Sequence, residues 1–265
     1  MDEPSALLVG PTPDASSLFS VAGLVTVVTG ASSGLGVRFA HVLHTAGAQV
    51  IVSARRADRL EQLADALPGV IAVPGDVSIN DDRERLIGVA LEAGGRLDVL
   101  VNNAGIGSPV PAEHETVDRF REVMDVNVTA VFALAQLAGR VMIERGSGSI
   151  INVASILGLV ASAPIKQASY AASKGAVVNL TRELAVQWAR KGVRVNALAP
   201  GWFPSELTAD MFEDPSSTTF IESNDPMARF GRPDELDGAL LFLASGASSY
   251  VTGHVLTVDG GWTAR

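Results

Sequence analysis

Leu24-Val25-Thr26-Val27-Val28-Thr29-Gly30-Ala31-Ser32-Ser33-Gly34-Leu35-Gly36 is the stretch that decides the fold of this 265-residue chain. Its apolar, β-branched first half predicts a strand over 24–29, and its glycine-rich half leads into a helical pattern that begins near residue 35. A loop between a strand and a helix points backbone amides and the positive helix N-terminus at an anion such as a phosphate. We interpret it as a phosphate cradle whose predicted members are Gly30, Ser32, Ser33, Gly34, Leu35 and Gly36.

The spacing of the glycines limits what kind of cradle this is. Gly30, Gly34 and Gly36 follow the pattern G-x-x-x-G-x-G, which differs from G-x-G-x-x-G and from a P-loop, because no Gly-Lys-Ser/Thr follows. Taken alone, the loop is also compatible with a strand-to-helix turn that binds no ligand. Other segments have to decide between the two interpretations.

Outward from this loop, short apolar runs alternate with longer amphipathic stretches. Further strands are predicted at 49–53, 70–73, 97–101, 149–153, 193–198 and 255–258. Helices are predicted at 35–46, 57–66, 80–93, 116–144, 168–190 and 234–244. This alternation is typical of the α/β class, with a doubly wound, mostly parallel sheet and helices on both of its faces.

The chain divides into an extension and one domain. Residues 1–17 mix prolines with polar residues and predict a flexible N-terminal extension. Residues 18–265 hold all the predicted strands without an internal linker, so we predict a single domain there. The stretch 202–233 is rich in Pro, Ser, Asp and scattered large apolar residues, which predicts a lid over a substrate.

Composition argues against several classes of protein. The chain has 20 Lys and Arg against 29 Asp and Glu, a net charge of −9, which argues against a nucleic-acid partner. It has no cysteine, which excludes disulfides and a cysteine nucleophile, and its four histidines predict no metal site. We find no targeting signal and no apolar run of about 18 residues, and therefore predict a cytoplasmic protein that has no membrane span.

Three polar side chains predict proton chemistry. Tyr170 and Lys174 are spaced i and i+4, so they share one face of a predicted helix. A nearby ammonium favours the phenolate, and would let a tyrosine act as an acid or base closer to neutral pH. Ser155 follows the strand at 149–153, at the edge of the sheet where such folds bind ligands. Taken singly, each of these residues could equally be an ordinary surface or turn residue.

Taken together, these motifs resemble those of the short-chain dehydrogenase/reductase family, in its single-domain branch. The resemblance covers the chain from about residue 18 to its C-terminus. It implies a Rossmann-type seven-stranded sheet of order 3-2-1-4-5-6-7, and NAD or NADP as cofactor. The motifs that carry it are Thr29 with Gly30, Gly34 and Gly36, Asn102-Asn103-Ala104-Gly105, Asn127, Ser155, Tyr170 with Lys174, Pro200-Gly201, and Val258-Asp259-Gly260-Gly261.

The resemblance also implies a role for each catalytic residue. Tyr170 would donate the proton in carbonyl reduction and accept it in alcohol oxidation, while Ser155 would orient the substrate oxygen. Lys174 would lower the pKa of Tyr170 and hydrogen-bond the nicotinamide ribose, and Asn127 would hold a water that links Lys174 to solvent. By the same resemblance the remaining cofactor contacts would be Asp76, Val77, Asn103, Ala104, Gly105, Pro200, Gly201, Phe203 and Ser205.

The choice of cofactor depends on the end of the second strand. An acidic residue there would bind the 2′-hydroxyl of NAD, but the chain reads Ser53-Ala54-Arg55-Arg56. Arg55 predicts a contact with the 2′-phosphate of NADP. NAD stays possible, because both arginines could simply be the solvated start of the next helix.

The predicted substrate is a small ketone or secondary alcohol, and we favour a neutral or apolar one because no basic cluster is evident. Within the family, the chain is similar to 3-oxoacyl-carrier-protein reductases and to polyol or gluconate dehydrogenases. Two positions more than is usual separate Ser155 from Tyr170, and the extra length falls in 161–166. Alternative functions are an NAD-dependent sugar or polyol dehydrogenase, a non-catalytic nucleotide-binding regulator, and an epimerase or dehydratase. The resemblance further implies a homotetramer or dimer that packs through 116–144 and 168–190.

Overall fold

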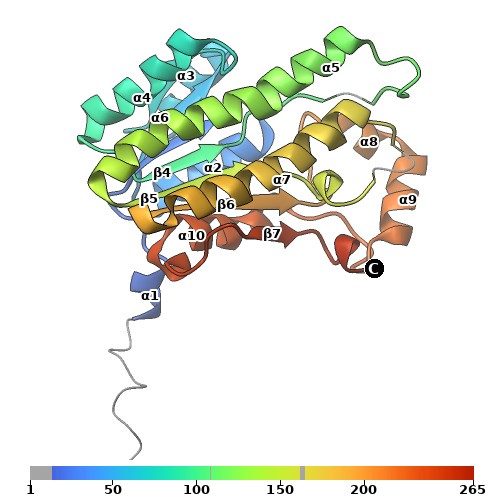
Figure 1. Cartoon of the computed structure of the whole chain (residues 1–265). Helices are drawn as coiled ribbons and strands as arrows, with labels where there is room; N and C mark the ends of the chain where they lie inside the picture. The colour runs from blue at the N-terminus through green and yellow to red at the C-terminus, as the bar shows by residue number, and fades with distance from the viewer. Residues whose placement is uncertain (1–13, 108, 162–164) are drawn as a thin grey trace, which may run out of the picture.

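The computed structural model describes residues 14–107, 109–161 and 165–265, and it has one parallel seven-stranded sheet (Figure 1). The strand order β3-β2-β1-β4-β5-β6-β7 confirms the predicted fold class. All six neighbouring strand pairs are parallel. The strands are β1 (Val25–Thr29), β2 (Gln49–Ala54), β3 (Ile71–Pro74), β4 (Val99–Asn102), β5 (Gly148–Val153), β6 (Val193–Pro200) and β7 (Val255–Val258).

Helices cover both faces of this sheet. One face packs on Phe39 of α2, Leu60 of α3 and Leu240 of α10, and the other on Leu86 of α4 and Leu134 of α6. Helix α7 lies beside α6 on that second face (Figure 1). The main helices are α2 (Gly34–Thr45), α3 (Ala57–Ala66), α4 (Asn80–Gly94), α5 (Val117–Met124), α6 (Ala130–Arg145), α7 (Ala168–Trp188) and α10 (Asp237–Ala244).

The central strands are apolar because they are covered on both sides. Every residue of β1 is buried, and β4 is buried throughout as well. All strands run the same way, so their carboxyl ends meet at one edge, on the side where α8 (Ala209–Glu213) and α9 (Pro215–Asn224) lie (Figure 1). A ligand site is expected at this edge.

The predicted helix over 116–144 is interrupted in its middle. Between α5 and α6, residues Asp125–Thr129 form a π-helical turn with Asn127 buried inside it. Over Val117–Arg145 the combined helix is long and apolar enough, by length and composition alone, to cross a membrane. Its buried residues, including Leu134 and Met142, belong to the core beneath the sheet, so it is a core helix of this fold.

The segment 202–233 is more regular than its composition predicts. It contains α8 and α9, and Asp214 begins α9 by accepting hydrogen bonds from the amides of Ser216 and Ser217. At the other end of the chain, residues 1–13 of the predicted extension lie outside the described residues. Its last residues form a single helical turn, α1 (Ala15–Leu18), which Asp14 caps.

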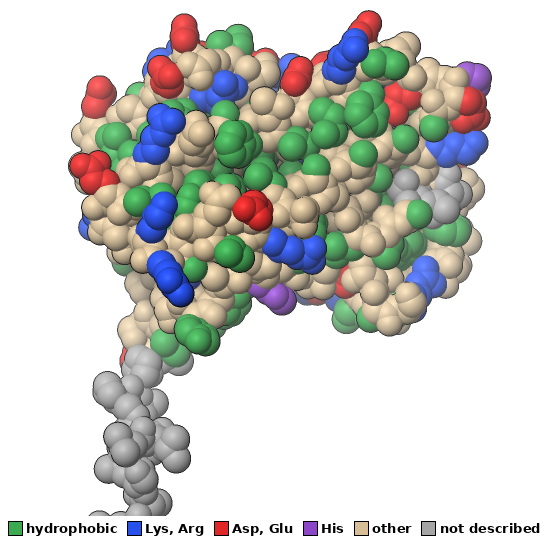
Figure 2. Space-filling model, viewed as in Figure 1, with side chains coloured by type: hydrophobic (Ala, Val, Ile, Leu, Met, Phe, Trp, Pro, Cys, Tyr) green, Lys and Arg blue, Asp and Glu red, His purple; other side chains and the backbone are tan. Residues whose placement is uncertain are grey.

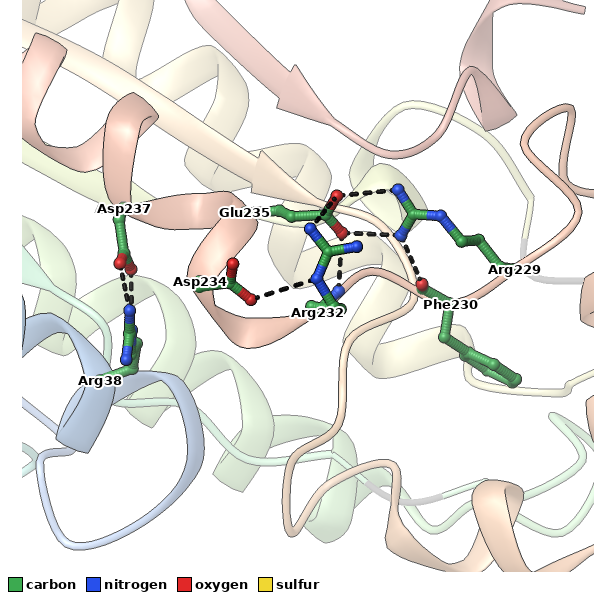
Figure 3. Close-up of polar contacts among 7 residues, drawn as sticks. All are labelled: Arg38, Arg229, Phe230, Arg232, Asp234, Glu235 and Asp237. Carbon is green, nitrogen blue, oxygen red and sulfur yellow. Dashed lines mark hydrogen bonds and ion pairs between the residues drawn. The ribbon is translucent and has the colours of Figure 1, made fainter.

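Charged pairs attach the end of this segment to the 3₁₀ turn Pro233–Leu236 that precedes α10, and attach α10 to α2 (Figure 3). Both guanidinium Nη atoms of Arg229 contact the carboxylate of Glu235, at 2.7 and 2.8 Å. Glu235 also accepts a 2.8 Å hydrogen bond from the Arg232 amide, and Arg38 of α2 pairs with Asp237. Arg229 donates to the carbonyl of Phe230, whose ring lies 4.2 Å from that of Phe212 in α8.

Candidate active site

The glycine loop between β1 and α2 is tightly folded. Gly30 has φ +68°, a conformation that side chains rarely adopt, and a Cβ there would lie 2.8 Å from Cα of Ala104. A Cβ on Gly36 would lie 2.2 Å from the Gly30 carbonyl oxygen, so α2 can start close to the loop only with glycine at this position. Ser33 is the N-cap of α2 and makes no capping hydrogen bond, and the first turn has no acidic residue. The α2 amides are therefore oriented as a phosphate would require.

The loop after β4 is attached to β1 by Thr29, which sequence reasoning did not include among the site residues. The Thr29 hydroxyl accepts hydrogen bonds from the amides of Asn103 and Ala104, each at 3.1 Å. The Asn103 side chain donates back to the Thr29 carbonyl at 2.9 Å. A threonine that ends a buried strand carries no distinctive signal by itself; pairing it with the Asn-Asn-Ala-Gly motif could have found it.

Ser155, Tyr170 and Lys174 come together although they lie on different elements. Ser155 precedes a 3₁₀ turn, Ile156–Gly158, and its hydroxyl hydrogen-bonds the Tyr170 phenol. Lys174 lies one helical turn after Tyr170 in α7, with Nζ 5.6 Å from the centre of the phenol ring. Nζ donates a 2.8 Å hydrogen bond to the carbonyl of Val153 at the end of β5. All three side chains are buried.

Asn127 supports this group from the π-helical turn. Its carboxamide oxygen accepts from the Ile106 amide and its nitrogen donates to the Ile106 carbonyl, both at 2.8 Å. The same nitrogen lies 3.0 Å from the hydroxyl of Ser173 in α7. The side chain therefore connects three segments, and it does not line the cavity described below.

Burial determines the protonation of Tyr170 and Lys174. It raises the pKa of Tyr170 to about 12, against which the hydrogen bond from Ser155 acts. It lowers the pKa of Lys174 to about 8. The pKa of Tyr170 thus departs from its ordinary value in the direction opposite to the one expected from an adjacent ammonium, because desolvation of the phenolate is the dominant effect.

One cavity of about 640 Å³ runs along the carboxyl edge of the sheet. It is lined by Ser155, Tyr170, Lys174 and every predicted cofactor residue except Gly36. Gly36 and Asn127 act from beneath the surface, through the packing and hydrogen bonds given above. Phe203 and Ser205 are contributed by the predicted lid, as are further residues of its first part, while 162–164 in the predicted longer loop lie outside the described residues.

Sequence reasoning gave no site role to Arg56 or Leu157, and it expected Trp202, Glu206 and Met211 only as part of the lid over 202–233. Arg56 and Glu206 line the cavity beside the predicted Arg55, and Trp202 and Met211 line it with Leu157. Arg56 was visible in the sequence as the neighbour of Arg55, whereas Glu206 was expected only as one of several acidic residues of the lid. Leu157 and Met211 are apolar residues of a kind found throughout the core.

The residues present fit a dinucleotide. Glycines hold the backbone where it can approach phosphates closely, uncapped amides begin α2, and two arginines stand at the end of β2. The opposite part of the cavity holds a phenol, a hydroxyl and an ammonium within one cluster. This arrangement can bind an anionic cofactor at one end and exchange a proton with a substrate oxygen at the other.

Comparisons with known proteins agree with this geometry. A family model described as enoyl-(acyl carrier protein) reductase matches residues 30–263. Galactitol 2-dehydrogenase (L-tagatose-forming) of Cereibacter sphaeroides is 41% identical over 94% of this chain and 99% of its own.

Two solved structures are also similar. A short-chain type dehydrogenase/reductase from Mycobacterium marinum has a TM-score of 0.90 at 37% identity, over 94% of this chain and 99% of that one. A gluconate 5-dehydrogenase from Burkholderia cenocepacia J2315, in complex with NADP and tartrate, has a TM-score of 0.89 at 36% identity, over 95% and 100%.

Proposed function

The chain belongs to the short-chain dehydrogenase/reductase family and is an oxidoreductase that acts on CH–OH groups, and from this premise we propose that it interconverts a ketone and a secondary alcohol with NADP(H). The observation that carries the proposal is the contact of the Ser155 hydroxyl with the Tyr170 phenol, with Lys174 one turn away in the same cavity as the glycine loop. The NADP complex of the Burkholderia relative supports the choice of cofactor, together with the arginines at the end of β2.

In this proposal the chain's own residues handle the proton and the orientation. NADP(H), when bound, supplies or accepts the hydride. The raised pKa keeps Tyr170 protonated at neutral pH, so the phenol is ready to donate its proton to a carbonyl oxygen that Ser155 holds. Lys174, with Nζ near the ring, stabilises the phenolate that this donation leaves behind.

We propose a polyhydroxylated substrate or the corresponding keto compound. Galactitol and gluconate, which the relatives' names give as their substrates, belong to this class. Gln167 and Ser155 offer polar contacts in this cavity, which Leu157, Trp202 and Met211 also line. This proposal differs from the neutral or apolar ketone that the sequence favoured.

We also propose that the chain forms a homotetramer or dimer through α5, α6 and α7. Exposed hydrophobic side chains on these helices include Val117 and Phe120 of α5, Phe132 of α6 and Val186 of α7. Figure 2 shows hydrophobic side chains gathered on the face that these helices form. Apolar groups of this kind on one face mark interaction sites.

A substrate panel tests the proposed activity. Galactitol, gluconate, 5-ketogluconate and an apolar ketone would be assayed with NADPH or NADP⁺ and with NADH or NAD⁺, by absorbance of the reduced nicotinamide. We expect activity on a polyhydroxylated compound and a loss of about 100-fold or more in kcat for Tyr170→Phe. Tyr250→Phe is the matched control, because Tyr250 is the other of the two tyrosines and is fully exposed. Equal activity of parent and Tyr170→Phe would favour the non-catalytic regulator.

A further inference from the structure

Arg56 is shared between the glycine loop and the segment that follows β6. Its Nη1 and Nη2 atoms lie 3.0 and 2.8 Å from the two carboxylate oxygens of Glu206, a bidentate ion pair. Its Nε and Nη2 atoms donate to the Ser32 hydroxyl at 3.1 and 3.0 Å. The guanidinium fork is therefore occupied by a carboxylate from a segment 150 positions away.

The position of Glu206 is set by the turn that contains it. The Thr208 hydroxyl accepts from the Ser205 amide at 2.9 Å and donates to the Phe203 carbonyl at 2.8 Å. Ser205 is also packed on the glycine loop, since a Cβ on Gly34 would lie 3.2 Å from the Ser205 Cβ. Glu206 is thus held above the loop where the cofactor phosphates are proposed to bind, and it lines the same cavity.

The exposure of the ion pair and the charges around it allow a phosphate to replace Glu206 at Arg56. The side chains of Arg56 and Glu206 are 42% and 51% exposed, so the ion pair is weak and screened by solvent. Arg56 holds the pKa of Glu206 below its usual range, with smaller contributions from a hydrogen bond with the Ser33 hydroxyl and from the charge of Arg59. A phosphate is a stronger bidentate partner for a guanidinium than a solvated carboxylate is, because it brings more charge and more acceptor oxygens.

We infer that Glu206 is a specificity-determining residue that competes with the 2′-phosphate of NADP for the Arg56 guanidinium. This inference rests on the proposed function, because it assumes that the dinucleotide lies in this cavity. NADP must displace Glu206 from Arg56 or share Arg56 with it, and the Glu206 carboxylate also repels the phosphate. NAD has no 2′-phosphate and leaves the ion pair intact. Glu206 therefore reduces the preference for NADP over NAD that Arg55 and Arg56 create.

The inference is tested by the binding of NADPH, NADH and 2′,5′-ADP, measured by isothermal titration calorimetry. The proteins are the parent, Glu206→Gln, Arg56→Gln and the double variant. For Glu206→Gln we expect the Kd of NADPH and of 2′,5′-ADP to fall about fivefold, and the Kd of NADH to change less than twofold. Glu213→Gln, which removes an exposed carboxylate from α8 of the same lid, should leave all three Kd values unchanged.

The double variant separates competition from simple repulsion. If Glu206 acts by occupying Arg56, the gain from Glu206→Gln largely disappears in the Arg56→Gln background. An equal gain in both backgrounds, or an equal gain for NADPH and NADH, would overturn the inference. So would an unchanged Kd for NADPH in Glu206→Gln, while the proposed function would stand. If the parent binds neither NADPH nor NADH, both proposals are overturned.

A readout without cofactor checks the ion pair itself. Hydrogen exchange of the amides in 203–208 should be faster in Glu206→Gln than in the parent, because the turn loses its attachment to Arg56. Glu213→Gln again serves as the control. Equal exchange in all three proteins would show that the contact does not hold the segment, and would contradict the inference.

Discussion

Tyr170 and Lys174 are two buried ionisable residues, one helical turn apart, whose protonation follows from desolvation. Burial favours the neutral form of each, so it raises the pKa of the phenol and lowers that of the ammonium. With a pKa of about 8, Lys174 still carries its charge at pH 7 in most molecules. A protonated phenol beside a mostly charged ammonium is the combination that the proposed carbonyl reduction uses.

The titration of Tyr170 can be measured directly, because the chain has only two tyrosines. Absorbance of tyrosinate near 295 nm would be followed against pH in cofactor-free parent and in Tyr170→Phe. The difference between the two curves should place the pKa of Tyr170 near 12, above its ordinary value of 10.0. Circular dichroism at each pH shows whether the fold is intact. A Tyr170 that ionises below pH 10 in folded protein would contradict the dominance of desolvation.

Among single residues, the sequence predicted those that a short sequence pattern identifies. Tyr170 and Lys174 share a helix face by spacing alone, and Ser155 follows directly on an apolar strand. The partnership of Arg56 and Glu206 was not predictable, since 150 positions separate them and neither lies in a recognisable pattern with the other. The sequence indicated Arg55 as the phosphate contact, whereas the structure places both arginines on the cavity.

Among the elements, the segment 202–233 shows where intrinsic helix propensity predicts the wrong structure. Helix α9 contains Ser216, Ser217, Thr218 and Thr219, residues with low helix propensity, so its pattern predicts a loop. It forms because Pro215 suits a first helical position, Asp214 caps the amides that follow, and Ile221 is fully buried in the cluster of Trp202 and Trp262. Tertiary burial and a cap outweigh the intrinsic preference.

The contact of Arg229 with Glu235 should stabilise the protein in a pH-dependent way. Together with the hydrogen bond from the Arg232 amide, it holds the pKa of Glu235 at about 2, below the ordinary 4.5, so the folded state favours the ionised carboxylate. This contribution is fully present above about pH 4.5 and is lost as the pH falls toward 2. Glu235→Gln should therefore lower the melting temperature at pH 7, and the difference from the parent should shrink as the pH falls below 4.5.

Thermal melts at pH 3, 4, 5 and 7 would measure this effect. Glu213→Gln is the comparison, since it removes an exposed carboxylate from the same region. A difference between parent and Glu235→Gln that stays constant over this pH range would mean that the ion pair is not its cause.

For the whole molecule, the exposed hydrophobic side chains of α5, α6 and α7 predict association. Val186 of α7 is 79% exposed, and Val186→Glu would place a charge on this surface. We expect light scattering at micromolar concentration to show a lower mass for Val186→Glu than for the parent. Ile79→Glu, an exposed site outside these helices, should keep the parental mass. A monomeric parent would contradict the proposed oligomer.

The architecture as a whole was the most predictable feature. All seven strands were predicted, because each strand of a parallel sheet covered on both faces is a short apolar run. The strand order came from the resemblance to a family, because apolar runs alone do not say which strands are neighbours. The sequence did not predict the π-helical turn, since Asp125-Val126-Asn127-Val128-Thr129 continues the helical pattern on either side of it.

That turn has a consequence for the geometry of the long helix. Successive residues of an α-helix are rotated by 100°, so one additional residue in a turn shifts the phase of everything beyond it. A row of residues that follows one face of α5 at regular helical spacing is therefore not continued on the same face of α6. Deleting one residue other than Asn127 from 125–129 would make the helix regular, but it would rotate α5 by about 100° against α6. Either Leu134 would leave the core or Asn127 would leave Ile106, so both contacts require the additional residue.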